Sequence, residues 1–228
     1  MTDIRKPIFD AVRAAGKSGL FNDSAKITAL DALLDDFGIP KSEPAVTDVT
    51  LKILLEIAKH EGIVPEAYKD SVGVWTWGIG VTNASGHQVY PRYKDNPQTL
   101  PYTLKVAVWL MRQKYLPPVL AAFEDCNLTE NELGAALSFQ YNTGGIARAT
   151  WVKQVVAGQL AEARVSILNW NKPPEILGRR KAERDLFFDG KWAGDGKALV
   201  YGVAKPSYHP KGAVNTDITA AAREALKP

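Results

Sequence analysis

The hydrophobic positions at the start of the chain predict a helical hairpin. Apolar residues recur at helical spacing over residues 4–15, and glycines then interrupt the pattern. A second apolar run over residues 24–37 follows possible capping residues and stops at Gly38. Residues 40–46 contain two prolines and mixed charge, which is typical of a linker.

A third helix and a β-hairpin are predicted next. From Thr47, apolar residues continue at helical spacing toward Glu61, and Gly62 is placed to end the helix. Residues 68–82 then alternate aromatic and β-branched side chains around a turn-like segment, 70–73. This hairpin is the only clear strand signal in the pattern.

Most of the remaining chain has the periodicity of helices, interrupted by paired prolines and glycines. The segment 189–210 is rich in glycine and proline, and residues 217–226 are typical of one last short helix. The expected class is therefore α+β, mostly helical with one small antiparallel sheet. The helices predicted in this part span residues 104–123, 130–141, 151–170 and about 175–187.

Composition is that of a globular protein. Of 228 residues, 46% are hydrophobic and 23% charged, as in ordinary soluble domains. The net charge of +3 suits an anionic polymer, such as a bacterial wall or a nucleic acid, without requiring either. Cys126 is the only cysteine, so no intrachain disulfide can form, which is compatible with a reducing cytoplasm.

Membrane, secretion and metal signals are missing from the pattern. No apolar run approaches the roughly 20 residues of a membrane span, and the first residues lack the apolar stretch of a secretory signal. His60, His87 and His209 are far apart in sequence and do not have metal-ligand spacing. We therefore expect no cofactor and no metal, and an accumulation in the cytoplasm or assembly into a particle.

Glu61 is a candidate general acid. It follows Leu54 and Ala58 at helical spacing and so shares their inward face. Apolar neighbours disfavour the charged form of a carboxyl group, which is what a general acid near neutral pH requires. Taken alone, the residue would be interpreted as an ordinary helix-end glutamate that reaches water.

Asp70 and Thr76 are candidates for the partner of that acid. Asp70 lies at the mouth of the predicted hairpin, where a short carboxylate is solvated, although a plain turn residue is the simpler interpretation. Strand alternation sends Trp75, Trp77 and Ile79 to one face and Thr76 to the other, beside glycines that allow close approach. A strand-forming threonine is the alternative. Two carboxyl groups in contrasting environments are the acid and base of glycoside hydrolysis.

These residues resemble a known family. Glu61, Asp70 and Thr76, followed by Gly78-Ile79-Gly80, are similar to the phage-type lysozymes and endolysins of glycoside hydrolase family 24. Two later segments extend the resemblance from residue 47 to about 190. They are Ala136-Leu137-Ser138-Phe139-Gln140-Tyr141-Asn142-Thr143-Gly144, which resembles a cleft-lining segment, and the arginine-rich stretch at residues 178–187.

The resemblance implies a fold and an activity. The fold would be lysozyme-like, with a small sheet beside a cleft, and the activity would be hydrolysis of the β-1,4 bond between N-acetylmuramic acid and N-acetylglucosamine. Glu61 would protonate the leaving oxygen, while Asp70 and Thr76 would position the water. Inversion would predict carboxyl groups about 6.5 to 9.5 Å apart.

The resemblance also implies the surroundings of the acid and the partners. Arg179 would support Glu61, although a cation favours the carboxylate and so opposes the effect of burial. The partner would be the glycan strands of peptidoglycan, with no nucleic acid and no membrane insertion, and the protein would be a monomer. The substrate-binding residues implied are Gly78, Gly80, Phe139, Asn142 and Gly144.

Three features depart from compact relatives. Val81 replaces a histidine that many relatives have after Gly-Ile-Gly, the loop 86–101 is longer, and both ends are extended. We predict residues 1–46 as a helical hairpin with a linker, 47–190 as the catalytic domain, and 191–228 as an extension packing on it. The hairpin would either bind the wall or a virion, or merely pack on the catalytic unit.

Other functions fit parts of the same pattern. A lysozyme-like unit without turnover would bind or scaffold peptidoglycan. A lytic transglycosylase needs an acid but no water held by an aspartate, so Asp70 is the feature against it. The basic stretch at residues 179–181 would otherwise be a solvated helix face or a patch for nucleic acid.

Overall fold

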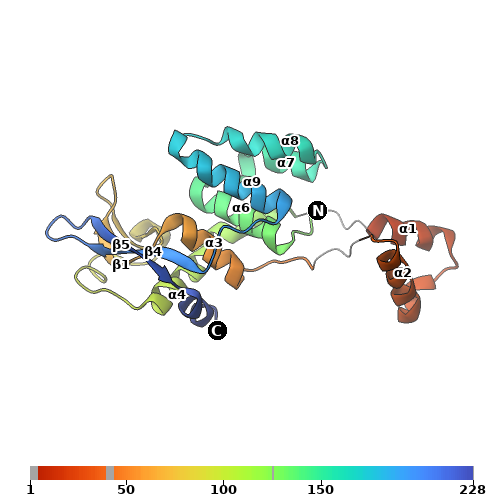
Figure 1. Cartoon of the computed structure of the whole chain (residues 1–228), viewed down its shortest axis with the longest axis horizontal. Coiled ribbons are helices and arrows are strands. Elements are labelled where there is room, and N and C mark those ends of the chain that lie inside the picture. The colour runs from red at the N-terminus through yellow and green to blue at the C-terminus, as the bar shows by residue number, and fades with distance from the viewer. Residues whose placement is uncertain (1–4, 40–43, 125, 228) are drawn as a thin grey trace.

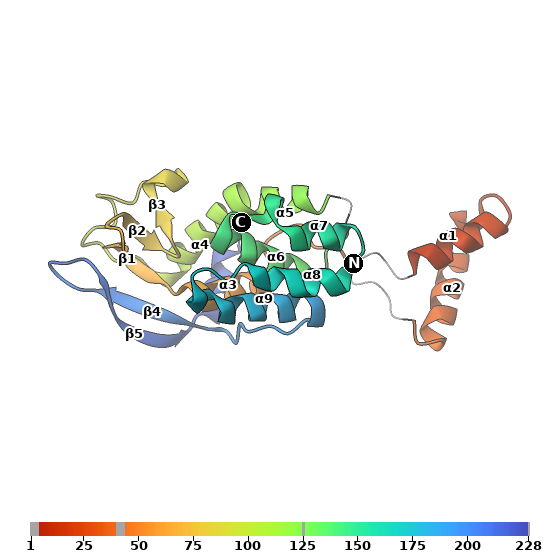
Figure 2. The same cartoon turned by 90° about the horizontal axis from the view of Figure 1, so that it is seen from above.

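The computed structural model describes residues 5–39, 44–124 and 126–227. The expectations for Ile4 and for the linker residues 40–43 lie outside these ranges. In two perpendicular views, the N-terminal helices α1 (Lys6–Ala15) and α2 (Ser24–Asp36) form a hairpin that lies apart from the rest of the chain (Figures 1 and 2).

This hairpin has its own polar anchor. The side chain of Arg5 is 4% exposed, and its NH1 group lies 2.9 Å from Asp31 Oδ1. Its NH2 group lies 2.5 Å from Asp35 Oδ1, and the guanidinium also donates to the carbonyl of Ile39. A buried cation that binds two carboxylates of α2 and the carbonyl of Ile39 just beyond it ties the two helices together.

Helix α3 (Leu51–Glu61) begins and ends on local signals. The hydroxyl of Thr50 accepts a hydrogen bond from the N–H of Ile53 at 3.3 Å, as an N-cap does. Gly62 ends the helix with φ 73°, a left-handed conformation that favours glycine. A Cβ at this position would also lie 2.9 Å from the ring of Tyr201, so Gly62 is required twice.

The first sheet follows directly. Strands β1 (Val64–Lys69), β2 (Trp75–Gly78) and β3 (Val81–Thr82) pair antiparallel in the order β1-β2-β3. The predicted hairpin is therefore present, with its first strand starting earlier than the predicted residue 68. The β1–β2 register is irregular between Val64 and Tyr68, so the middle of β1 takes hydrogen-bond partners from elsewhere.

One detail of the predicted alternation is wrong. Trp77 packs in a small core beneath the sheet, whereas Ile79 is buried in the main core. The two side chains do not share a face because Gly78 and Gly80 have φ values of 64° and 78°. Positive φ ends the strand at Gly78, and the period of two no longer applies beyond it.

A long helical segment then crosses the main core. Helix α4 (Leu100–Leu110) continues through a π-helical turn (Met111–Tyr115) into α5 (Leu116–Ala122). Proline lacks an N–H donor and is tolerated in the first turn of a helix. Pro117 and Pro118 lie in the first turn of α5. The segment predicted as one helix can contain them because the wider π-helical turn comes just before.

The main core is organised around α6 (Glu130–Thr143), which packs against both α3 and α9 (Leu177–Asp189). The helix predicted over 151–170 is instead two helices, α7 (Thr150–Val156) and α8 (Leu160–Ser166). The break falls at Gly158, which has φ 75°.

A second sheet closes the fold and was not predicted. Strands β4 (Lys197–Val203) and β5 (Pro210–Asp217) pair antiparallel, and α10 (Thr219–Ala225) packs on α4. Figure 1 shows β4 beside β1, and the N–H of Ile63 donates to the carbonyl of Leu199 at 2.8 Å. Over the described residues, the architecture is α+β and mostly helical, as expected, with two small antiparallel sheets.

Candidate active site

Glu61 is the last residue of α3 and is paired with Arg179. Its side chain is 24% exposed, and Glu61 Oε1 accepts a hydrogen bond from Arg179 NH1 on α9. Leu54 and Ala58, on the same helix, are fully buried. The carboxyl group is therefore more exposed to solvent than the periodicity indicated. Arg179 contacts it, as the resemblance implied.

Arg179 is itself fixed from below. Its Nε lies 3.0 Å from Glu183 Oε1, and its NH2 donates to the carbonyl and the hydroxyl of Ser138, each at 3.1 Å. The nearby Glu61 and Glu183 raise the pKa of Arg179 against the effect of burial, which alone would lower it. The guanidinium therefore stays charged while it orients Glu61.

A second buried arginine completes this cluster. The side chain of Arg180 is 0% exposed, and its NH1 lies 2.8 Å from Glu183 Oε2. Its NH2 donates to Asn142 Oδ1 at 2.7 Å, and its guanidinium lies 4.8 Å from the ring centroid of Phe139. Burial lowers the pKa of Arg180, and burial raises that of Glu183 although both guanidiniums oppose it.

Three tyrosines lie around the Glu61 carboxyl group. Burial, Asp70 and Glu61 together raise the pKa of Tyr68 to about 12. Burial and then Glu61 also raise the pKa of Tyr115 and that of Tyr141. Both candidate carboxyl groups thus contribute to the raised pKa of Tyr68.

Asp70 begins the turn between β1 and β2. Its Oδ1 accepts hydrogen bonds from the N–H groups of Val72 at 3.0 Å and Val74 at 2.8 Å. This is the Asx geometry expected of a turn aspartate. Ser71, Val72 and Gly73 around it are exposed, so the turn interpretation and an accessible carboxylate hold together.

Thr76 lies on β2, the central strand of the first sheet, shortly after the Asp70 turn. It is 4% exposed and pairs with Tyr68 on one side and Thr82 on the other. Its hydroxyl donates to the carbonyl of Val74 at 3.2 Å, the same residue whose N–H binds Asp70. The side-chain oxygen thereby keeps its lone pairs for another donor.

The five residues implied to bind substrate have different exposures. Gly80, Asn142 and Gly144 are exposed. Phe139 is fully buried, with ring centroids 5.3 Å from Trp151 and 5.1 Å from Trp170, and its expected contact with substrate stays a prediction. Gly78 is also buried, and a Cβ there would lie 3.2 Å from Thr103, so its small size serves packing.

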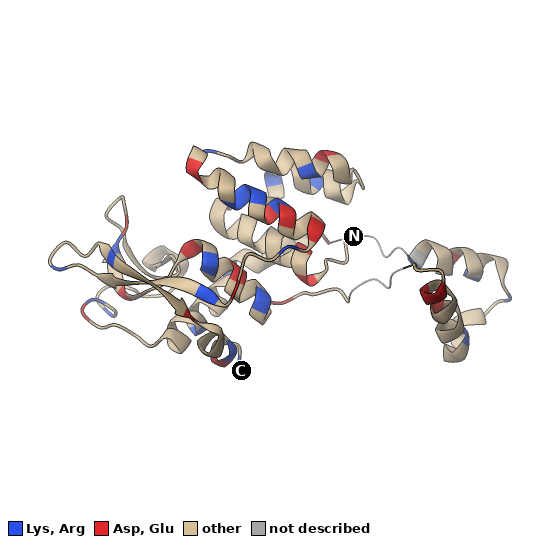
Figure 3. Cartoon of the chain, in the orientation of Figure 1, with Lys and Arg blue, Asp and Glu red and all other residues tan. Residues whose placement is uncertain are grey.

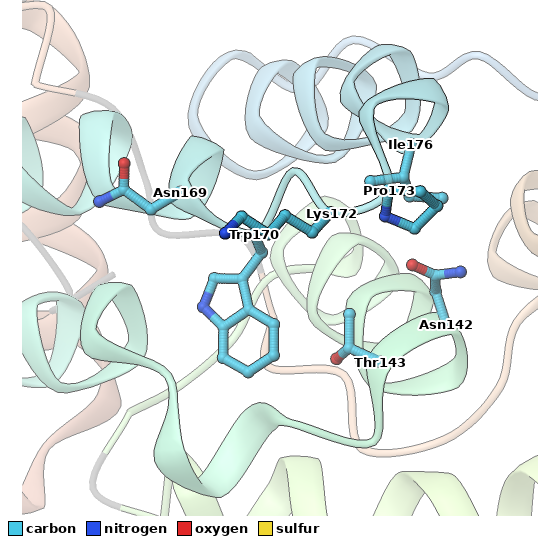
Figure 4. A pocket seen from close by; sticks show the side chains of 7 residues that line it. All are labelled: Asn142, Thr143, Asn169, Trp170, Lys172, Pro173 and Ile176. Carbon is cyan, nitrogen blue, oxygen red and sulfur yellow. The ribbon is translucent and has the colours of Figure 1, made fainter.

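A pocket of about 530 Å³ adjoins the end of α6. Figure 4 shows its lining side chains, which come from the α6 terminus and from the segment before α9. Asn142 joins this pocket to the buried arginine pair, because its carbonyl oxygen accepts from Arg180. The lining residues are Asn142, Thr143, Asn169, Trp170, Lys172, Pro173 and Ile176.

Several of these residues were not found from the sequence. Tyr68, Tyr115 and Tyr141 come from β1, the π-helical turn and α6, so no local motif unites them. Ser138 and Glu183 lie within the segments 136–144 and 178–187, but their helical spacing is compatible with either a core or a surface position. The available signal was the spacing of Glu183, an acid four residues after Arg179, because side chains at this spacing meet on a helix.

Three charged residues of α9 are buried in the interior. Figure 3 shows basic and acidic residues interleaved along this helix. Arg179 and Arg180 are buried, which argues against the basic patch for nucleic acid. Within the described residues, no three metal-ligating side chains come together, and no helix has both the length and the apolarity to cross a membrane.

Comparison with known proteins identifies the family. A phage lysozyme family model matches residues 58–183, which is more than half of the chain. An endolysin of Acyrthosiphon pisum secondary endosymbiont phage 1 is 26% identical over 151 residues, covering 61% of this chain and 97% of that protein.

Solved structures share the fold. A P22 lysozyme mutant superposes with TM-score 0.54 at 23% identity, covering 62% of this chain and 99% of that one. An endolysin from Escherichia coli O157:H7 phage FAHEc1 gives TM-score 0.51 at 23% identity, with 65% and 98% covered. The chain belongs to the phage lysozyme family of peptidoglycan-cleaving hydrolases.

Proposed function

We propose that the protein is a muramidase that hydrolyses the β-1,4 bond between N-acetylmuramic acid and N-acetylglucosamine. Glu61 is the general acid, and Asp70 with Thr76 positions the water. The observation that carries this proposal is that a carboxyl group held by Arg179 ends α3 and a second carboxyl group follows β1 in an exposed turn, so that one short strand separates them. Both groups also act on Tyr68 of that strand.

The proposed reaction is a single displacement. Glu61 donates its proton to the glycosidic oxygen as the bond from that oxygen to muramic acid C1 breaks. Arg179 contacts Oε1, so Oε2 is the oxygen that carries the proton. A water molecule forms the new bond to C1 from the opposite face, and its proton passes to Asp70.

Asp70 and Thr76 share the work of holding that water. Asp70 Oδ1 is engaged by two backbone N–H groups, which fix the carboxylate and leave Oδ2 for the water. The Thr76 hydroxyl already donates to Val74, so it accepts a hydrogen bond from the same water. The anomeric configuration is then inverted.

We further propose that the glycan strand contacts the exposed residues Gly80, Asn142 and Gly144, and that the pocket of Figure 4 belongs to the substrate site. The protein acts as a monomer. It accumulates in the host bacterium until its release to the wall, or it is carried in a phage particle.

The test is clearing of purified cell walls at pH 7. Glu61→Gln and Asp70→Asn should each lower the rate by at least about a hundred-fold, the scale of a general acid or base. The exposed Glu162→Gln is the matched control and should clear walls like the parent. Full clearing by Glu61→Gln would refute the assignment.

Product analysis distinguishes the alternatives. Digestion in heavy-oxygen water should label a reducing muramic-acid end, and the first product should have the α configuration. An anhydro end would identify a lytic transglycosylase, and wall binding without any product would identify a scaffold.

A further inference from the structure

The β1 strand connects the two candidate carboxyl groups, and its backbone is held from both sides. Glu61 precedes β1 and Asp70 follows it. The irregular register between β1 and β2 leaves the middle of β1 without its usual partner on β2. The distance between the carboxyl groups therefore depends on whatever else fixes this strand.

The β4–β5 hairpin holds both ends of β1. Near Glu61, the N–H of Ile63 donates to the Leu199 carbonyl and the Ile63 carbonyl accepts from Tyr201 N–H, both at 2.8 Å. Next to Asp70, the N–H of Lys69 donates to the Tyr208 carbonyl at 2.7 Å. The hairpin thus spans the strand from the residue after Gly62 to the residue before Asp70.

The long loop 86–99 holds the middle of the same strand. The N–H of Ala67 donates to the Tyr93 carbonyl, and the N–H of Gln98 donates to the Pro65 carbonyl, each at 2.9 Å. Tyr93 is buried and stacks on Trp77 with ring centroids 4.0 Å apart. This loop supplies backbone hydrogen bonds to the middle of β1, where β2 contributes only the side chain of Trp77, whose Nε1 donates to the Pro65 carbonyl at 2.7 Å.

The hairpin and the loop meet at Asp95. Lys205 Nζ lies 2.5 Å from Asp95 Oδ1, and the Tyr208 hydroxyl donates to Asp95 Oδ2 at 3.0 Å. Lys205 also contacts Glu66 on β1 itself. Asp95 and Tyr208 have φ values of 56° and 60°, a region that costs a non-glycine residue energy and persists where the surroundings over-determine it.

The base of the hairpin is anchored as well. Glu56 on α3 is fully buried, and its Oε2 accepts from the N–H groups of Ala193 at 2.9 Å and Gly194 at 2.7 Å. A Cβ on Gly194 would lie 2.9 Å from the Glu56 nitrogen. The segment leading into β4 is therefore fixed to the helix that carries Glu61.

We propose that the β4–β5 hairpin and loop 86–99 form one clamp that sets the separation of Glu61 and Asp70, with Lys205 and Tyr208 as positioning residues. This inference rests on the proposed muramidase function. Two of the three departures from compact relatives, the long loop and the C-terminal extension, then have a common role in holding the catalytic residues. A displacement of reacting groups by about 1 Å can cost up to a hundred-fold in rate.

The test compares Lys205→Met, Tyr208→Phe and their combination in the full chain. Lys211→Met is the matched control, since Lys211 is exposed on the facing strand of the hairpin. On a soluble glycan well below the Tm, we expect the double variant to lose about ten-fold in kcat with KM within about two-fold. Lys205→Arg keeps the charge and should restore most of the rate lost in Lys205→Met.

Amide hydrogen exchange gives a readout that does not depend on activity. The Lys69 amide should exchange faster in the double variant, while the amide of Leu137 in the core keeps its parental rate. Unchanged kcat, an unchanged Lys69 amide, or an equal loss in Lys211→Met would each overturn the clamp. An inactive parent would refute the proposed function, and the Lys69 amide would still decide whether the clamp holds the strand.

Discussion

Replacing Glu183 by glutamine should destabilise the protein severely. The carboxylate is 0% exposed and contacts Arg179 Nε at 3.0 Å, Arg180 NH1 at 2.8 Å and the Ser138 hydroxyl at 2.8 Å. The amide removes the negative charge that lies between two buried guanidiniums. Glu61 remains as a counter-ion for Arg179 alone, so Arg180 becomes an uncompensated buried cation.

The magnitude follows from these contacts. Breaking a buried ion pair by removing one partner costs about 3–5 kcal/mol. Burial raises the pKa of Glu183 even with both arginines beside it, so desolvation offsets part of the pairing energy, and the amide oxygen still accepts one hydrogen bond. We therefore expect about 3 kcal/mol, more than a hundred-fold in the folding equilibrium constant.

Urea unfolding at pH 7 measures this loss, with Glu175→Gln as the control. Glu175 is exposed near the start of the same helix, so its amide should change the free energy of unfolding by less than about 0.5 kcal/mol. A loss below about 1 kcal/mol in Glu183→Gln would refute the view that this carboxylate neutralises the arginine pair. The variant should also clear walls more slowly, because Arg179 loses the contact that orients it.

Two further predictions concern titration. Because Glu61 is among the groups that raise the pKa of Tyr68 to about 12, Glu61→Gln removes a negative charge and should make Tyr68 ionise at lower pH in ring-labelled NMR; an unchanged titration would separate the two residues. Hydrogen bonds from Lys205, and then from Lys94 and Tyr208, hold the pKa of Asp95 well below its usual range. The folded state therefore gains stability from this carboxylate above the ordinary aspartate pKa and loses that stability as pH falls. The Tm difference between the parent and Asp95→Asn should be constant above about pH 5 and become smaller in more acidic solution. A difference that grows in acid would contradict this sign.

The sequence predicted the elements whose signals are local. Helix α3 ends at Gly62 because a left-handed residue is needed there, and the pattern identified that stop. Arg179 was expected beside Glu61 from its motif, and it contacts Glu61 in the structure. The proposed catalytic roles and the division into 1–46, 47–190 and 191–228 stay predictions.

The missed features depend on tertiary contacts. Seven of the eight residues of β5 are exposed, so the strand has no alternation of apolar and polar positions to reveal it. The tyrosines around Glu61 come from three separate elements, and Phe139 is covered by Trp151 and Trp170 from outside its own helix. Periodicity reports which face of an element is apolar, but it does not report what that face meets.

The order of the strands has a consequence for synthesis. Residues 64–69 leave the ribosome well before residues 197–217, whose backbone fixes both ends of that earlier strand. A nascent chain that lacks β4 and β5 therefore has the proposed acid and base without the hairpin half of the clamp. The proposed spacing of acid and base would then be set only when translation of this region is finished.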